Sequence, residues 1–222
     1  MAAVTIDEIT LADDPHTWSA FGFEVCGDRC LIGSVWVRFA GSDTRTLAAS
    51  NGGLVGWSLR GVGEVPLDGL PTAASESAAP DCAESHPNGV SAIDHVVAVS
   101  PDLDRTTAAL QDAGLDLRRV REEATPAGAP RQAFFRLGEA ILEVVQEPDE
   151  VLARHGGSDR AAHFWGIALL SDEIERTAAT FGGHCSEVRD AVQPGRRIAT
   201  VKRSAGLALP VALMSGVGEA VT

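Results

Sequence analysis

Residues 93–106 read IDHVVAVSPDLDRT, and residues 164–177 read FWGIALLSDEIERT. Each segment begins with an apolar run, continues through a serine and acidic residues, and ends in an acid-Arg-Thr triplet. A short apolar run of this kind indicates a buried strand, and Ser or Asp after it is typical of a helix start. The two segments are therefore copies of one strand–helix unit, separated by 71 residues.

Each copy continues in the same order beyond this segment. The expected helices, 103–112 and 173–181, take N-cap residues from 100–102 and 171–173, and both end at glycine, a common C-terminal cap. Three strand-like segments then follow in each copy. They are 115–120, 132–137 and 140–145 in the first copy, and 185–190, 198–202 and 209–214 in the second. Each copy therefore predicts the order βαβββ.

A weaker third copy opens the chain. Residues 5–11 match residues 92–98 in pattern. A short helix is expected over 15–21, with strands over 23–26, 31–39 and 54–59. The segment 63–90 is rich in Pro, Ala, Ser and acids and predicts an extended linker. We therefore expect an α+β protein made of a degenerate βαβββ-like module over 1–62, the linker, and two further modules over 91–150 and 160–217.

Two polar residues interrupt apolar strands of the second module. Glu143 lies within Ala140–Val145, and His95 lies within Ile93–Val99. Burying a lone carboxylate costs several kcal/mol, so Glu143 needs an arginine, a proton or a metal ion. Arg131, Arg136 or Arg197 could form such an ion pair, and His95 could be a hydrogen-bonded core histidine. The alternative is a functional site shared by the two strands.

Composition and charge exclude several classes of function. The 222 residues include 18 basic and 31 acidic ones, for a formal net charge of −13. Such a chain is unsuited to non-specific nucleic-acid binding or to an anionic membrane surface. No apolar stretch approaches the roughly 20 residues that span a bilayer, and the N-terminus lacks the pattern of a secretory signal. We expect a cytoplasmic protein whose partner is a small molecule.

The repeated βαβββ unit, with His95 in its first strand and Glu143 in its last, resembles the vicinal oxygen chelate superfamily. This group includes glyoxalase I, extradiol dioxygenases, fosfomycin-resistance proteins and bleomycin-binding proteins. The resemblance is carried by residues 93–97, 101–104, 134–138 and 142–145. It implies that two modules curl an eight-stranded sheet into a cup, whose first and last strands hold one divalent metal ion.

The resemblance implies His95 and Glu143 as metal ligands, but their partners in the last module fall at Gly166 and near Ala212. In the first module Glu8 aligns with His95, and the counterpart of Glu143 falls near Gly56 or Trp57. If modules one and two share the cup, Glu8 completes a three-ligand site. If modules two and three share it, His163 would have to be recruited. A mixed nitrogen and oxygen site suits Fe, Mn, Ni, Co or Zn.

The function that this resemblance implies is a metal-dependent enzyme acting on a small oxygenated metabolite, of the lyase, isomerase or dioxygenase type. Glu143 would also shuttle a proton. The alternative is a metal-free protein that binds and sequesters a small molecule, with a homodimer as a further expectation. Candidate substrate-binding residues are Arg131, Phe134, Trp165 and Arg197, although the aromatics could be plain core and the arginines solvent-facing strand starts.

Overall fold

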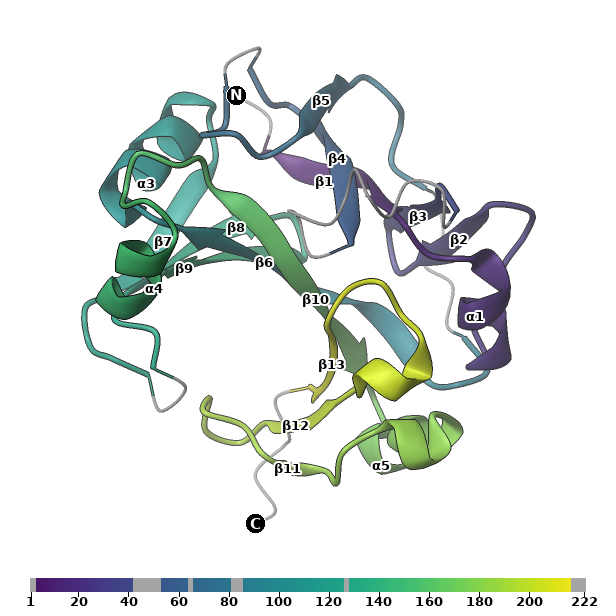
Figure 1. Ribbon diagram of the computed structural model, residues 1–222. Helices are drawn as coiled ribbons and strands as arrows, with labels where there is room; N and C mark the ends of the chain where they lie inside the picture. Colours follow the sequence, from purple (N-terminus) through teal and green to yellow (C-terminus); the bar gives the residue numbers. More distant parts are fainter. Residues whose placement is uncertain (1–2, 42–52, 64–65, 81–85, 126–127, 217–222) are drawn as a thin grey trace.

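The computed structural model describes residues 3–41, 53–63, 66–80, 86–125 and 128–216. Two sheets organise it: one of eight strands, in the order β11-β12-β13-β10-β6-β9-β8-β7, and one of five, in the order β2-β3-β1-β4-β5. The larger sheet curves around an open space, with helices α3 and α5 on its outer side, and the smaller sheet packs beside it (Figure 1). The expected α+β class, with a cupped mixed sheet and outer helices, is confirmed.

The second and third copies build the eight-stranded sheet together. Their elements are β6 Val90–Ser100, α3 Leu103–Asp112, β7 Asp116–Arg121, β8 Gln132–Leu137 and β9 Ala140–Gln146, then β10 His163–Ser171, α5 Ile174–Thr180, β11 Arg189–Asp190, β12 Arg197–Thr200 and β13 Val211–Ser215. Helix α4, Asp149–Arg154, and two short 3₁₀ helices, Gly182–His184 and Arg203–Ala205, lie between them. Strands β6 and β10 run antiparallel at the centre, and each pairs in parallel with the last strand of its own copy.

Matching side-chain contacts confirm the repeat. The hydroxyls of Ser100 and Thr106 lie 2.6 Å apart, and those of Ser171 and Thr177 lie 2.7 Å apart. The cap of α3 also forms as expected, since Asp102 accepts a hydrogen bond from a backbone N–H of the first turn. Helix α5 differs, because its N-cap residue makes no side-chain cap bond.

Alternation along the central strands divides their side chains between two environments. Val96, Ala98, Leu142 and Val144 are fully buried on the outer face. Their neighbours Val97, Val99, Ile141 and Val145 line the cup instead. Since side chains of a strand point to opposite faces in turn, the outer face forms the core and the inner face is free to hold a site.

The N-terminal copy forms the five-stranded sheet. Its elements are β1 Thr5–Leu11, α1 Pro15–Ala20, β2 Arg29–Ile32, β3 Val35–Phe39, β4 Leu54–Arg60 and β5 Thr72–Ser75. The expected strand 23–26 does not form. The expected strand 31–39 is instead part of a hairpin, which turns at Gly33 and Ser34 between β2 and β3. Gly33 has a φ of +61°, a conformation that glycine adopts without strain.

Strand β4 corresponds to β10 rather than to the last strand of its own module. It runs antiparallel to β1, as β10 does to β6. The backbone N–H of Trp57 donates to the carbonyl of Pro71 over 3.1 Å, and Ile167 donates to Pro210 over the same distance. Strand β5, from the segment expected to be a linker, therefore takes the place of β13. The five-stranded sheet reproduces the central five strands of the larger one.

The two sheets share one apolar core. The rings of Trp57 on β4 and Phe164 on β10 meet edge to face with centroids 5.0 Å apart. Leu67 and Leu70, from the 63–90 segment, are buried at 3% exposure each. Nearby, Asp68 forms an ion pair with Arg105 at the start of α3. Within the described residues, no helix is long and apolar enough to cross a membrane.

Candidate active site

The concave face of the eight-stranded sheet encloses a cavity of about 1720 Å³. His95, Glu143, Phe134 and Trp165 all line it. Phe134 lies opposite Glu143 on the neighbouring strand, and Trp165 is half exposed at 50%. The structure thus brings together four of the residues that the sequence singled out.

His95 and Glu143 face each other within this cavity. In the parallel pairing of β6 with β9, His95 pairs with Ile141, two residues before Glu143 and on the same face, and His95 Nε2 lies 3.6 Å from Glu143 Oε2. The other carboxylate oxygen of Glu143 accepts a hydrogen bond from the amide of Gln132 on β8. Burial raises the pKa of Glu143, and the positive charge of His95 and the amide bond offset only part of that rise.

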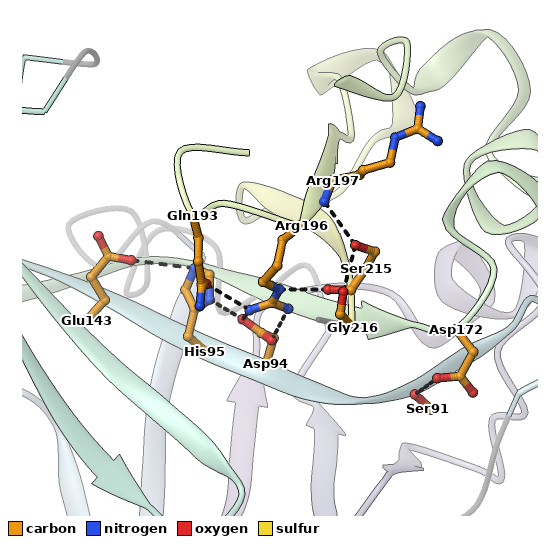
Figure 2. A network of polar contacts seen from close by, with 10 residues as sticks. All are labelled: Ser91, Asp94, His95, Glu143, Asp172, Gln193, Arg196, Arg197, Ser215 and Gly216. Atoms are coloured by element: carbon orange, nitrogen blue, oxygen red, sulfur yellow. Dashed lines mark hydrogen bonds and ion pairs between the residues drawn. The ribbon is translucent and has the colours of Figure 1, made fainter. Parts of the chain in front are cut away.

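Asp94 holds the other ring nitrogen of His95. The Nδ1 of His95 lies 2.7 Å from Asp94 Oδ2 (Figure 2). Asp94 and His95 are adjacent in the chain, yet both line the cavity. His95 pairs with Ala168 and Ile93 with Leu169, so Asp94 is an extra residue in β6 and forms a bulge. A bulge interrupts strict alternation, so adjacent side chains can reach one site.

Arg196 anchors Asp94 from the opposite wall of the cup. Its guanidinium forms an ion pair with Asp94 and donates to the carbonyl of Ser215 over 2.7 Å (Figure 2). Burial alone would raise the pKa of Asp94, but hydrogen bonds and charges from His95 and Arg196 hold it below its usual value. Asp94 is therefore a carboxylate that fixes the orientation of His95.

Arg131 and Arg197 do not reach the cavity. Arg197 forms an ion pair with Glu175 on α5, and its side chain points away from Asp94 (Figure 2). Arg131 binds Asp104 on α3 and also Glu122. Both arginines tie a strand to the helix of its own copy. Their neighbours in sequence, Gln132 and Arg196, line the cup instead, because successive strand residues face opposite sides.

The third copy supplies no metal ligand at the equivalent places. Val97 pairs with Glu143 in one half of the sheet, and Ala168 pairs with Ala212 in the other. His95 corresponds to Gly166, where an added Cβ would lie only 2.5 Å from the carbonyl oxygen of Pro210. A side chain is therefore sterically excluded at that position.

Glu8 lies in the five-stranded sheet and does not join His95 and Glu143. Its carboxylate binds Arg38 at 2.8 Å and Arg29 at 3.2 Å. His163 lines the cavity, and burial lowers its pKa. Even so, the described residues contain no group of three or more His, Cys, Asp or Glu placed to hold a metal ion. Catalytic metal sites commonly use at least three protein ligands, so this donor set does not fit a resident metal.

Three residues of the site were not among the sequence candidates: Asp94, Gln132 and Arg196. Gln132 and Arg196 directly precede or follow the chosen arginines, so a correct face assignment would have found them. Asp94 carried a signal too, because Ile-Asp precedes the aligned residue in the first two of the three copies, as Ile6-Asp7-Glu8 and Ile93-Asp94-His95.

Comparisons with known proteins agree with this geometry. A family model described as Glyoxalase/Bleomycin resistance protein/Dioxygenase superfamily matches residues 92–203, just over half of the chain. No curated protein matches the sequence. Methylmalonyl-CoA epimerase from Mycobacterium tuberculosis is 18% identical, with a TM-score of 0.48 over 59% of this chain and 91% of its own.

A second solved structure resembles nearly the whole chain. It is a xylose isomerase-like TIM barrel/4-hydroxyphenylpyruvate dioxygenase fusion protein, 13% identical, with a TM-score of 0.61. The match covers 99% of this chain and 51% of the fusion protein, so this chain spans about half of that length. At this identity the likeness establishes the fold, including the five-stranded sheet. By family match, repeat and cup, the chain belongs to the glyoxalase/bleomycin resistance/dioxygenase superfamily, the vicinal oxygen chelate group.

Proposed function

We propose that this protein is an enzyme that transfers a proton on a small oxygenated metabolite bound in the cup, in an isomerase or lyase type of reaction. The observation that carries the proposal is the largely buried carboxylate of Glu143, with 18% of its side chain exposed, which faces His95 Nε2 at 3.6 Å inside a cavity. Glu143 is the catalytic residue, taking a proton from carbon beside a carbonyl group or returning it.

The environment of Glu143 suits this role. A general base works best when its pKa lies near the operating pH, and burial moves the pKa of Glu143 in that direction. Gln132 holds one carboxylate oxygen and leaves the other facing His95. This limits the rotation of the group and directs it into the cavity.

His95 is the second participant. With Nδ1 donating to Asp94, the Nε2 atom faces Glu143 and the substrate space. A protonated His95 donates toward Glu143 or toward a developing oxyanion, and a neutral one accepts a proton there. Asp94 and Arg196 are positioning residues, because they act through the orientation of His95.

The metal-dependent form of this chemistry, with Fe, Mn, Ni, Co or Zn, needs ligands beyond His95 and Glu143. Gly166 and Ala212 offer none, so no step proposed here passes through a metal ion. Metal content is a separate measurement. Elemental analysis of the wild type and of His95→Ala, after incubation with Mn(II), Fe(II), Ni(II) and Zn(II), determines whether the two donors retain any metal.

The experiment that tests proton transfer is hydrogen–deuterium exchange in D₂O. A panel of 2-oxo acids, 2-hydroxy acids and acyl thioesters is incubated with the wild type and with Glu143→Gln, and loss of C–H signal is followed by NMR. We expect exchange on at least one compound, and a loss on the order of 10²- to 10⁴-fold in Glu143→Gln. Undiminished exchange in that variant would contradict the proposal.

The second candidate function is a metal-free binding protein that sequesters a small molecule. It is favoured by the steric exclusion of a side chain at Gly166 and by the methyl group at Ala212. Both hypotheses place the ligand in the cup. A compound that binds the wild type and Glu143→Gln equally well, without exchange in either, would favour sequestration.

A further inference from the structure

Three arginines line one wall of the cup, on its two outermost strands beside Glu143. They are Arg119 and Arg121 on β7 and Arg136 on β8. The register places them in successive rows across the sheet. Arg119 lies beside Phe134, which lies beside Glu143, and Arg121 lies beside Gln132. Arg136 lies beside Ile141, which pairs with His95. The cationic wall is thus adjacent to the proposed reacting groups.

The arginines of this wall differ from the other arginines of the cavity in how they are paired. Elsewhere in the cavity Arg196 is paired with Asp94, and Arg160 with Glu147. No ion pair or hydrogen bond joins the side chains of Arg119, Arg121 or Arg136 to any described residue. Glu123 and Glu139 also line the cavity as exposed residues, and neither forms an ion pair with these arginines among the described residues. A wall of three unpaired cations is unexpected in a chain with a net charge of −13.

Arg121 provides the more specific evidence. Its Nε atom is buried and has no hydrogen-bond partner among the described residues. A buried donor without an acceptor destabilises the folded state, so such groups usually have a partner from solvent or from a ligand. Its charge contributes to the electrostatics of Glu143, but the carboxylate bonds to Gln132 and faces His95 instead. The guanidinium fork therefore remains available to a ligand.

We propose that Arg119, Arg121 and Arg136 form an anion subsite, which binds a carboxylate or phosphate group of the substrate and places the adjoining carbon near Glu143. Guanidinium groups recognise both anions through paired hydrogen bonds. The substrate class narrows to small oxygenated acids or phosphate esters. This inference rests on the cup being the binding site, as in the proposed function, but not on the chemistry of Glu143.

Calorimetric titration of the full chain with inorganic phosphate and with malonate tests the subsite, and malonamide serves as the neutral analogue. We expect saturable binding of at least one anion and none of malonamide. Arg121→Gln should weaken anion binding at least about tenfold. Arg119→Gln and Arg136→Gln should weaken it by smaller factors. The relative affinities for phosphate and malonate identify which anion the subsite prefers.

Arg118→Gln is the matched control. Arg118 lies on the same strand, outside the cavity lining, and binds Asp116 at 3.1 Å with a largely exposed side chain. It removes the same charge, so a general electrostatic effect would weaken binding equally in both variants and overturn the proposal. So would failure of the wild type to bind either anion at millimolar concentration. Circular dichroism establishes folding, and Arg121→Lys, which keeps the charge but loses the fork, should fall between Arg121→Gln and the wild type.

Glu143→Gln separates this inference from the proposed function. The substitution removes a negative charge near the arginine wall, so anion affinity should be equal or higher, while proton exchange is lost. Anion binding without exchange in the wild type would sustain the subsite and contradict the enzyme. Proton exchange on neutral substrates, with no anion binding, would support the enzyme and contradict the anion subsite.

Discussion

The five-stranded and eight-stranded sheets carry different residues at equivalent positions. Glu8 occupies the place of His95, because both lie on the first strand after an Ile-Asp pair. Arg38 occupies the place of Glu143, because Thr10 pairs with Arg38 as Val97 pairs with Glu143. The expected counterpart near Gly56 or Trp57 was therefore wrong, since it assumed that β4 closes the first module.

The two pairs differ in whether they satisfy each other, and this distinguishes a structural ion pair from the proposed functional pair. Glu8 and Arg38 form an ion pair at 2.8 Å and satisfy each other. His95 and Glu143 are 3.6 Å apart in a large cavity, and burial raises the pKa of Glu143. One sheet pairs its charges internally, whereas the other leaves reactive groups facing a space that a ligand can enter.

Asp94 and Asp7 provide the largest expected effect on stability; Asp7 is the extra residue of a bulge in β1, as Asp94 is in β6. Asp94→Asn removes the carboxylate that pairs with Arg196, whose side chain is 9% exposed. Asp7→Asn removes the carboxylate that pairs with Arg60, whose side chain is 14% exposed. Breaking a buried ion pair costs about 3 kcal/mol or more, so urea denaturation should show a comparable loss in both variants. Only Asp94→Asn should also reduce proton exchange. Equal loss of exchange in Asp7→Asn would break the distinction between the sheets.

The two strand glycines should differ in their tolerance of a methyl group. At Gly166 an added Cβ would lie 2.5 Å from the carbonyl oxygen of Pro210, and at Gly56 it would lie 3.0 Å from that of Pro71. Overpacking of this kind costs about 1–3 kcal/mol, so Gly166→Ala should lower the free energy of unfolding more than Gly56→Ala. Thermal denaturation of the two variants compares them directly, and the reverse order would contradict the packing argument.

Glu143→Gln should stabilise the protein although it removes the proposed catalytic group. Because the folded-state pKa of Glu143 is raised, the folded protein binds more protons than the unfolded chain above about pH 4.3. The unfolding free energy contributed by Glu143 therefore falls as pH rises to the raised pKa. Glu143→Gln lacks this pH dependence, so the excess of its unfolding free energy over that of the wild type should grow as pH rises from about 4.3 to the raised pKa. Urea unfolding at several pH values measures it, and a constant difference would argue against the raised pKa.

Glu8→Gln should have the smallest effect and the opposite sign. It weakens ion pairs with Arg29 and Arg38, whose side chains are 50% and 40% exposed. Such partly solvated pairs contribute about 0.2–1 kcal/mol, so a slight loss of thermal stability is expected. Proton exchange and anion affinity should match the wild type. A large loss of either would place the five-stranded sheet in the functional site.

Much of the fold follows from local patterns. The apolar runs and glycine caps predicted the boundaries of α3, β8 and β9 to within one residue. Strand β6 was predicted too, but it starts three residues earlier than expected, at Val90. Patterns of this kind do not reveal which strand pairs with which. The role of β4 and the origin of β5 in the supposed linker depend on pairing between segments far apart in the chain.

The candidate site shows the same division. His95 and Glu143 were recognisable because a polar residue in an apolar strand costs free energy unless it has a partner. Arg131 and Arg197 were chosen one residue away from Gln132 and Arg196, the side chains that line the cup. A shift of one residue reverses the face of a strand, and the bulge at Asp94 breaks the alternation on which such an assignment depends.

The repeat, the α+β class and the His95–Glu143 pair are properties of the sequence, because they rest on periodicity and on the cost of burying polar groups. Which modules share the cup, where Glu8 lies and which arginines remain unpaired were decided only by the tertiary structure. Those outcomes depend on strand registers and on contacts between residues far apart in the chain, as in the Arg196–Asp94 ion pair. Local sequence patterns do not predict such contacts.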